Sequence, residues 1–134
     1  MEELLGLAAE EVVDVAALDV LLRGLGEGGA ALLVELVEQF VSEFPATSAA
    51  LRESLAAGAF ERVAAEAHRL RSSTGNLAVR AMSAACQRVE QAARAGDLAR
   101  ARDGLSALEA AFAVASGALR SYAASAHCRD CTEN

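Results

Sequence analysis

The clearest helical pattern in the chain lies between residues 98 and 122. Hydrophobic positions recur there in alternating steps of three and four residues, as on one face of an α-helix. They are Leu98, Ala101, Leu105, Leu108, Phe112, Ala115, Leu119 and Tyr122. Asp97 precedes the pattern, where an N-cap is preferred, and Gly96 can end the helix before it. We therefore predict a helix over residues 98–122.

Three more helices are predicted upstream, over residues 30–57, 59–74 and 79–95. Pro45 lies inside the first of these and is expected to kink it, because proline removes one hydrogen bond of the helical ladder. Gly58 offers this helix a C-terminal cap, and Gly75 and Asn76 mark a turn between the other two. Four helices with short connections predict an all-α fold, an antiparallel four-helix bundle.

The region before residue 30 is expected to add one or two short helices. One is predicted over Glu2–Val13 and another over Ala16–Leu25, with a glycine-rich hinge at residues 26–29. Residues after Ala124 are polar and are expected to fray. We therefore predict a helical N-terminal extension over residues 1–15, a bundle domain over 16–124 and a flexible tail over 125–134.

Composition agrees with an all-α fold and limits the expected partners and cellular location. The sequence is 54% hydrophobic but only 4% aromatic, with one proline, and its net charge is −7, which argues against nucleic acid as the main partner. No apolar run is long enough to span a bilayer, and the N-terminus is acidic where a secretory signal would be basic. Three cysteines do not make a disulfide framework. We expect a cytoplasmic monomer.

Charge is unevenly distributed along the chain. From Met1 to Glu43 there are ten acidic residues against one basic residue, Arg23. From Phe60 to Arg102 there are eight arginines against four acidic residues. The middle of the chain is therefore suited to bind an anionic group or partner.

Other groups of reactive residues give weak signals. His127, Cys128 and Cys131 have a metal-like spacing, but three candidate ligands near one terminus do not predict a metal site. Cys86 occupies an inward helical position and is interpreted as a small buried hydrophobe. The glycines of residues 24–29 follow no strand and precede no Lys-Ser/Thr pair, so they do not predict a phosphate loop.

His68 is predicted to lie outside the buried face of its helix. That face is defined by Phe60, Val63, Ala67, Leu70 and Thr74, and at about 100° per residue His68 falls about 120° from its centre. Its neighbours on the exposed side are small, namely Ala64, Ala65, Ser72 and Gly75, while Arg71 stands one turn further on. A large partner could approach such an imidazole closely, although an ordinary surface histidine fits the same pattern.

The local sequence resembles a known motif. Residues 67–78 read Ala-His-Arg-Leu-Arg-Ser-Ser-Thr-Gly-Asn-Leu-Ala, which is similar to the histidine phosphotransfer (HPt) motif Ala-His-x-Leu-Lys-Gly-Ser-(Ser/Ala)-x-x-Leu-Gly. The matching residues are Ala67, His68, Leu70, Ser73 and Leu77, and Arg71 replaces the lysine with the same charge. Ser72 and Ala78 stand where the family has glycine. The resemblance covers about residues 18–122.

The resemblance implies a phosphocarrier. His68 would relay a phosphoryl group, through Nε2, to and from the aspartate of response-regulator receiver domains or a hybrid histidine kinase. Arg71 would neutralise phosphoryl charge, and Glu90 would orient the imidazole. The carrier would need no cofactor of its own, because Mg²⁺ would sit on the receiver. The residues expected to dock the partner are Ala64, Ala65, Arg69, Ser72, Gly75, Arg94, Leu18 and Leu22.

Three other readings stay open at the level of sequence. The first is a module of the same fold that docks a receiver or kinase and regulates it without transfer. The second is the dimerising phosphoacceptor hairpin of a sensor kinase, which normally has an acidic residue where this chain has Arg69. The third is a purely structural helical bundle.

Overall fold

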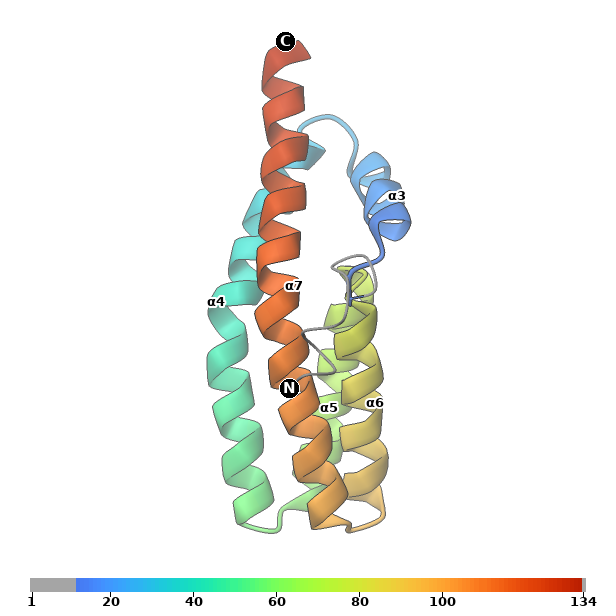
Figure 1. The fold of residues 1–134 in the computed structure, drawn as a ribbon, viewed down its shortest axis with the longest axis vertical. Helices are drawn as coiled ribbons and strands as arrows, with labels where there is room; N and C mark the ends of the chain where they lie inside the picture. Colours follow the sequence, from blue (N-terminus) through green and yellow to red (C-terminus); the bar gives the residue numbers. More distant parts are fainter. Residues whose placement is uncertain (1–11, 134) are drawn as a thin grey trace.

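The computed structural model describes residues 12–133. It contains five helices in this range: α3 (Val15–Leu25), α4 (Gly29–Ala56), α5 (Phe60–Asn76), α6 (Arg80–Arg94) and α7 (Leu98–Glu133). Helices α4 to α7 form an antiparallel bundle, and α3 lies beyond the ends of α5 and α6, beside the upper part of α7 (Figure 1). The prediction of an all-α bundle is confirmed. The helix predicted over Glu2–Val13 lies almost wholly outside the described residues.

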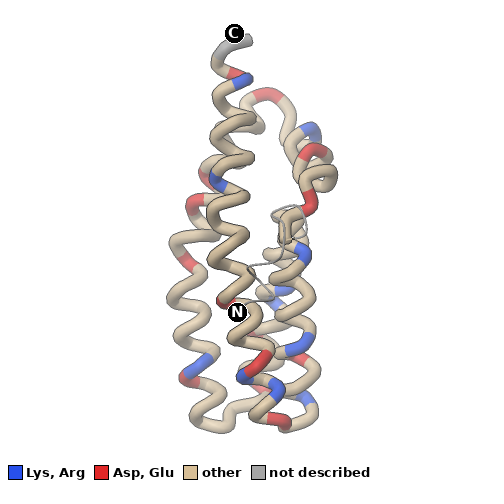
Figure 2. The backbone as a smooth tube through the Cα atoms, in the orientation of Figure 1, with Lys and Arg blue, Asp and Glu red and all other residues tan. Residues whose placement is uncertain are grey.

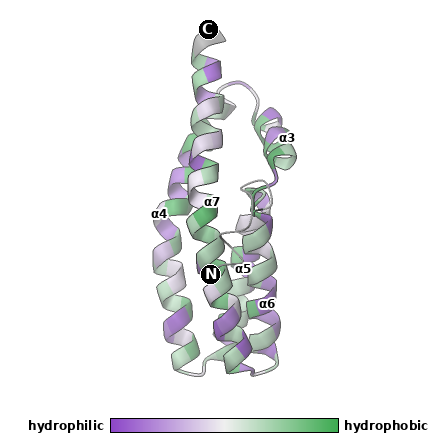
Figure 3. Cartoon of the chain, in the orientation of Figure 1, coloured by the Kyte–Doolittle hydropathy of each residue, from purple (hydrophilic) through white to green (hydrophobic). Residues whose placement is uncertain are grey.

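The core forms where the hydrophobic faces of these helices meet. Hydrophobic and hydrophilic positions alternate along α4 to α7 (Figure 3). The largest fully buried side chains include Leu33, Leu51, Met82, Leu105, Leu108 and Leu119, and burying each stabilises the fold by roughly 1.5–3 kcal/mol. Between α6 and α7 the backbones approach closely, because a Cβ at Gly104 would lie 2.9 Å from Val89 Cγ2. No helix in the described part of the chain is both long and apolar enough to cross a membrane.

Helix α4 packs mainly on α7 and continues through Pro45 to Ala56. Phe44 of α4 stacks on Phe112 of α7 with ring centroids 4.1 Å apart. At the surface, Arg52 of α4 donates to the carboxylate of Glu109 on α7. This hydrogen bond lowers the pKa of Glu109, outweighing the opposite effect of burial. In contrast α4 and α5 touch little, so α5 depends chiefly on α6 for its position.

Three helix ends share one capping arrangement, a Schellman motif with a residue of positive φ. The predicted caps Gly58 and Gly96 are confirmed, with φ of 71° and 67°. At the end of α5 the corresponding residue is Ala78, with φ of 58°. There the amide of Val79 donates to the carbonyl of Thr74 at 2.9 Å and the amide of Ala78 to that of Gly75 at 3.1 Å.

The turn predicted at Gly75 and Asn76 is therefore wrong by two residues. Both still belong to α5, and the chain reverses at residues 77–79. The segment before α3 holds this turn: the amide of Asp14 donates to the carbonyl of Ala78 at 2.8 Å, and Val13 pairs with Val79 in an isolated β-bridge. An alanine in the left-handed region was not expected, because L side chains disfavour it.

The predicted flexible tail is also corrected, since α7 continues helically to Glu133. Ala123 and Ala126 extend the buried stripe beyond Leu119, and Ala126 packs near Leu22 of α3. The hydroxyl of Tyr122 donates to the carboxylate of Asp19 in α3. Alanines carry this stripe, so its hydrophobic signal is weaker than that of the leucines before it. The helix predicted over Ala16–Leu25 is confirmed as α3, which is rich in hydrophobic positions (Figure 3).

The strained cap yields a stability prediction. Ala78→Gly should raise the free energy of unfolding by about 0.5–1 kcal/mol, because glycine occupies the left-handed region without the steric cost borne by alanine. Urea unfolding measures the change. The matched control is Ala50→Gly in the exposed middle of α4, which should lower stability by about 1 kcal/mol. Equal destabilisation by both substitutions would contradict a strained Ala78.

The contact between α3 and α7 yields a spectroscopic prediction. Burial, aided by the hydrogen bond to Asp19, raises the pKa of Tyr122 to about 12, against an ordinary value of about 10. The neutral phenol therefore stabilises the fold below pH 10, and this contribution disappears as pH rises through 12. Because Tyr122 is the only tyrosine and tryptophan is absent, phenolate absorbance reports it directly. If the pKa of Tyr122 is ordinary while the protein keeps its helical circular dichroism, the contact between Tyr122 of α7 and Asp19 of α3 is contradicted.

Candidate functional site

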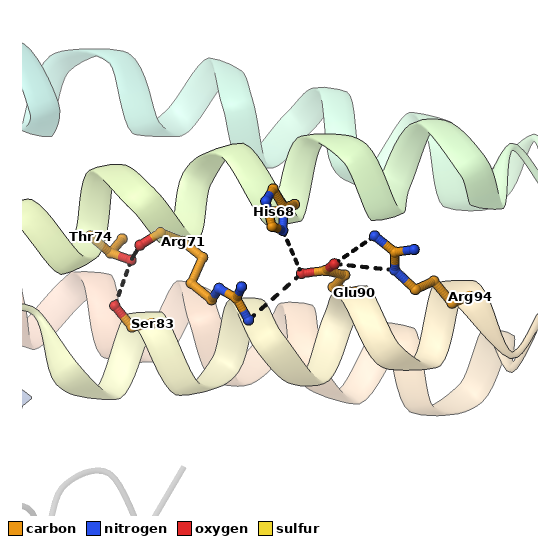
Figure 4. A network of polar contacts seen from close by, with 6 residues as sticks. All are labelled: His68, Arg71, Thr74, Ser83, Glu90 and Arg94. Carbon is orange, nitrogen blue, oxygen red and sulfur yellow. Dashed lines mark hydrogen bonds and ion pairs between the residues drawn. The ribbon is translucent and has the colours of Figure 1, made fainter.

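His68 lies on the open side of α5 and points toward α6 (Figure 4). Its side chain is 57% exposed, and Nδ1 lies 3.3 Å from Oε1 of Glu90 on α6. The exposure predicted from helical periodicity is thus confirmed. The imidazole is held at one nitrogen, while most of the ring faces solvent.

Glu90 is the centre of the polar cluster around His68. Its side chain is only 10% exposed, yet it meets three potential cations. Arg94, one turn along α6, donates to Oε2 from Nε at 3.1 Å and from Nη2 at 2.8 Å, and Nη1 of Arg71 on α5 lies 3.9 Å from Oε1. Figure 4 shows Glu90 between these groups.

The electrostatics of the cluster favour an ionised Glu90. Burial raises the pKa of this carboxyl group, but hydrogen bonds from Arg94 and His68 together outweigh burial and leave the pKa below its ordinary value. An ionised carboxylate can only accept hydrogen bonds. In neutral His68 the proton is therefore on Nδ1, which donates to Glu90, and the lone pair is on Nε2.

The register between α5 and α6 brings His68 opposite Glu90. Six residues further along α5, Oγ1 of Thr74 donates to the carbonyl of Arg71 at 3.0 Å and lies 2.8 Å from Oγ of Ser83 on α6 (Figure 4). Thr74 is buried, and this pair joins the helices between the turn and the site. From the sequence, Thr74 is predicted to lie in the core, but its hydrogen bond to Ser83 is not predicted. Such a bond depends on the register between two helices, which hydrophobic periodicity does not fix.

The surroundings of His68 match the prediction in part. Ala65, Ser72 and Gly75 are exposed beside it, as expected. The prediction is wrong for Ala64, because this residue is only 6% exposed and belongs to the buried core. It lines the floor of a shallow depression together with Phe60, Glu61, Ala65, Ala93 and Arg94.

The leucines expected to dock a partner are displaced from His68. Leu18 is fully buried in the core, so this assignment is wrong. Leu22 is half-buried near Ala126, at the far end of α7, because α3 lies beyond the end of the bundle. Leu21 instead lines a groove with Leu36, Phe40, Ser73 and Leu77 between α4 and α5. Periodicity cannot tell which of several leucines in a short hydrophobic helix faces the bundle.

Arg69 is exposed at the edge of α5. Its Nη1 lies 3.3 Å from the carboxylate of Glu66, and it lines the neighbouring part of the groove between α4 and α5. Figure 2 shows basic positions along α5 and α6, while acidic positions prevail on α4. The uneven charge of the sequence therefore places basic residues on α5 and α6 and acidic residues on α4.

Within residues 12–133, no group of three or more histidine, cysteine, aspartate or glutamate side chains could hold a metal ion. Nε2 of His127 lies 3.8 Å from Sγ of Cys131, one turn apart on α7. Cys86 is fully buried, and burial raises the pKa of its thiol to about 12, so it is not a nucleophile at neutral pH.

The comparison with known families bears on this cluster. The family model described as the Hpt domain matches residues 35–118, which include His68, Arg71, Glu90 and Arg94. The chain belongs to the Hpt domain family. Membership implies a phosphotransfer role in two-component signalling, and Hpt domains generally interact with response-regulator receivers or kinases. Neither a curated protein nor a solved structure matches the chain significantly.

Proposed function

We propose that this Hpt domain relays a phosphoryl group between His68 and the aspartate of response-regulator receiver domains. One observation carries the proposal: His68 is exposed, and its Nδ1 is engaged by a buried, ionised Glu90. The nitrogen that remains accessible is Nε2, which in the neutral ring holds the lone pair. A histidine used only for surface solubility has no need of a buried carboxylate.

The proposed step is an in-line displacement at phosphorus. Nε2 forms a bond to phosphorus, while the bond from phosphorus to the aspartyl oxygen of the receiver breaks and the aspartate leaves as a carboxylate. The imidazole ring gains positive charge as Nε2 bonds, because Nδ1 keeps its proton. Glu90 lies where its negative charge offsets that gain. Transfer to the next receiver reverses the step.

Arg71 is the proposed partner of the phosphoryl oxygens. It follows His68 by three residues, is partly exposed, and contacts Oε1 of Glu90 only loosely, at 3.9 Å. A guanidinium can pair with two phosphoryl oxygens at once, which favours moving from this long contact to the phosphoryl group. Ser72, exposed beside His68, adds a hydroxyl that can also donate to a phosphoryl oxygen.

The receiver domain would supply the metal ion for the reaction. We propose that Mg²⁺ comes with the receiver and that the chain acts in the cytoplasm, where receivers and hybrid kinases work. The proposed docking surface runs over Ala65, Ser72 and Gly75 around His68, with Arg69 at its rim. The groove containing Leu21 and Leu36 continues it toward α3.

The test is transfer of radiolabelled phosphate from phosphorylated receiver domains encoded in the same genome. The native chain should acquire a label that is stable to base and lost in acid, as for a phosphohistidine. His68→Gln should abolish the label, a loss of at least about 100-fold, because an amide cannot act as the nucleophile. The matched control is His127→Gln, which replaces the only other histidine and should retain full labelling.

Two results would contradict the proposal. Labelling of the His68→Gln variant would place the phosphoryl group elsewhere. Binding of receivers without any labelling of the native chain would favour the module that docks and regulates without transfer.

A further inference from the structure

Arg94 is directed at Glu90, the residue that contacts His68. Its side chain is 64% exposed, but Nε and Nη2 both donate to the same carboxylate oxygen, Oε2. The other oxygen, Oε1, receives Nδ1 of His68. Arg94 and His68 thus contact different oxygens of one buried carboxylate. Arg94 and His68 do not contact each other.

We infer that Arg94 is a positioning residue, which keeps the carboxylate of Glu90 charged and fixed so that His68 presents a nucleophilic Nε2. The inference rests on the proposed function and gives Arg94 a role in addition to any contact with a receiver. A neutral Glu90 would carry a proton that it could donate to Nδ1. The imidazole would then hold its own proton on Nε2, where it blocks attack on phosphorus.

The arrangement shows why Glu90 needs this partner. Burial opposes its charge, and of the groups around it Arg94 makes the shortest contacts. Two side chains of α5, His68 and Arg71, also face Glu90. Nη1 of Arg71 lies 3.9 Å from Oε1 of Glu90. Glu61 of α5 lines the depression beside Arg94 and adds a second negative charge there. Within the described residues, α7 contributes no ion pair to Glu90.

The sign of the expected effect follows from the charges. Removing the cation makes protonation of Glu90 easier, since the carboxylate loses the hydrogen bonds and the positive charge of Arg94. The reactive state, in which ionised Glu90 holds the imidazole proton on Nδ1, then extends less far toward low pH. In Arg94→Met the acid limb of the rate profile should therefore move up by about one pH unit, which lowers the rate about tenfold on that limb.

The experiment uses the full chain and phosphoramidate, a small phosphoryl donor that needs no receiver. Nε2 displaces ammonia from phosphorus, so a bond from nitrogen to phosphorus forms as the donor's own breaks. Rates are compared with the native chain at each pH from 5 to 9, after circular dichroism has shown that each variant is folded. Carboxyl-carbon NMR of Glu90 is titrated in parallel and does not depend on phosphorylation.

Matched variants separate positioning from a general effect of charge. Arg94→Lys should restore most of the native profile, whereas Arg88→Met, which removes an exposed arginine from the other side of α6, should leave it unchanged. In Glu90→Gln the same Arg94→Met change should have little effect, because the charged link is gone.

The inference is overturned if Arg94→Met leaves both the Glu90 titration and the acid limb at their native positions. It is also overturned if Arg88→Met moves them equally, or if Arg94→Lys behaves like Arg94→Met. Failure of the native chain to become phosphorylated at His68 would instead count against the proposed function, and the NMR titration would still decide the role of Arg94.

Discussion

The site depends on one buried carboxylate shared between two helices. Glu90 belongs to α6, is nearly enclosed, and is contacted by His68 and Arg71 from α5 and by Arg94 from its own helix. An isolated charge at this depth would be costly, so the flanking arginines are a condition for its presence. Oε1 of Glu90 in turn holds Nδ1 of the otherwise exposed His68, and this contact orients the imidazole as the proposed phosphotransfer requires.

The bundle serves this interaction by setting the register of α5 against α6. These helices share an extensive interface, whereas α5 and α4 touch little. The capped turn at Ala78 and the pair Thr74–Ser83 fix how far the two helices slide past each other. The segment around Asp14 binds the same turn from outside, so the chain before α3 takes part in holding the register.

Much of the fold could be predicted from the sequence because leucines and phenylalanines recur at helical spacing. The end of α7 was missed because alanines such as Ala123 and Ala126 continue the buried stripe with little hydrophobic signal. Ala78 was missed as a cap because glycine is the residue that usually signals a positive φ. At the site, exposure of His68 followed from its helical angle, and Glu90 followed only from family resemblance. The pairing of Arg94 with Glu90 lies at a spacing of four residues, yet its importance depends on burial, which the sequence does not give.

The position of phosphorus on the imidazole tests the proposed mechanism most directly. Heteronuclear NMR of the native chain, phosphorylated by a receiver and labelled with ¹⁵N in histidine, distinguishes the two ring nitrogens and the two histidines. Because Glu90 occupies the side of Nδ1, we predict phosphorus on Nε2 of His68 alone. Phosphorus on Nδ1 of His68, or on His127, would contradict it.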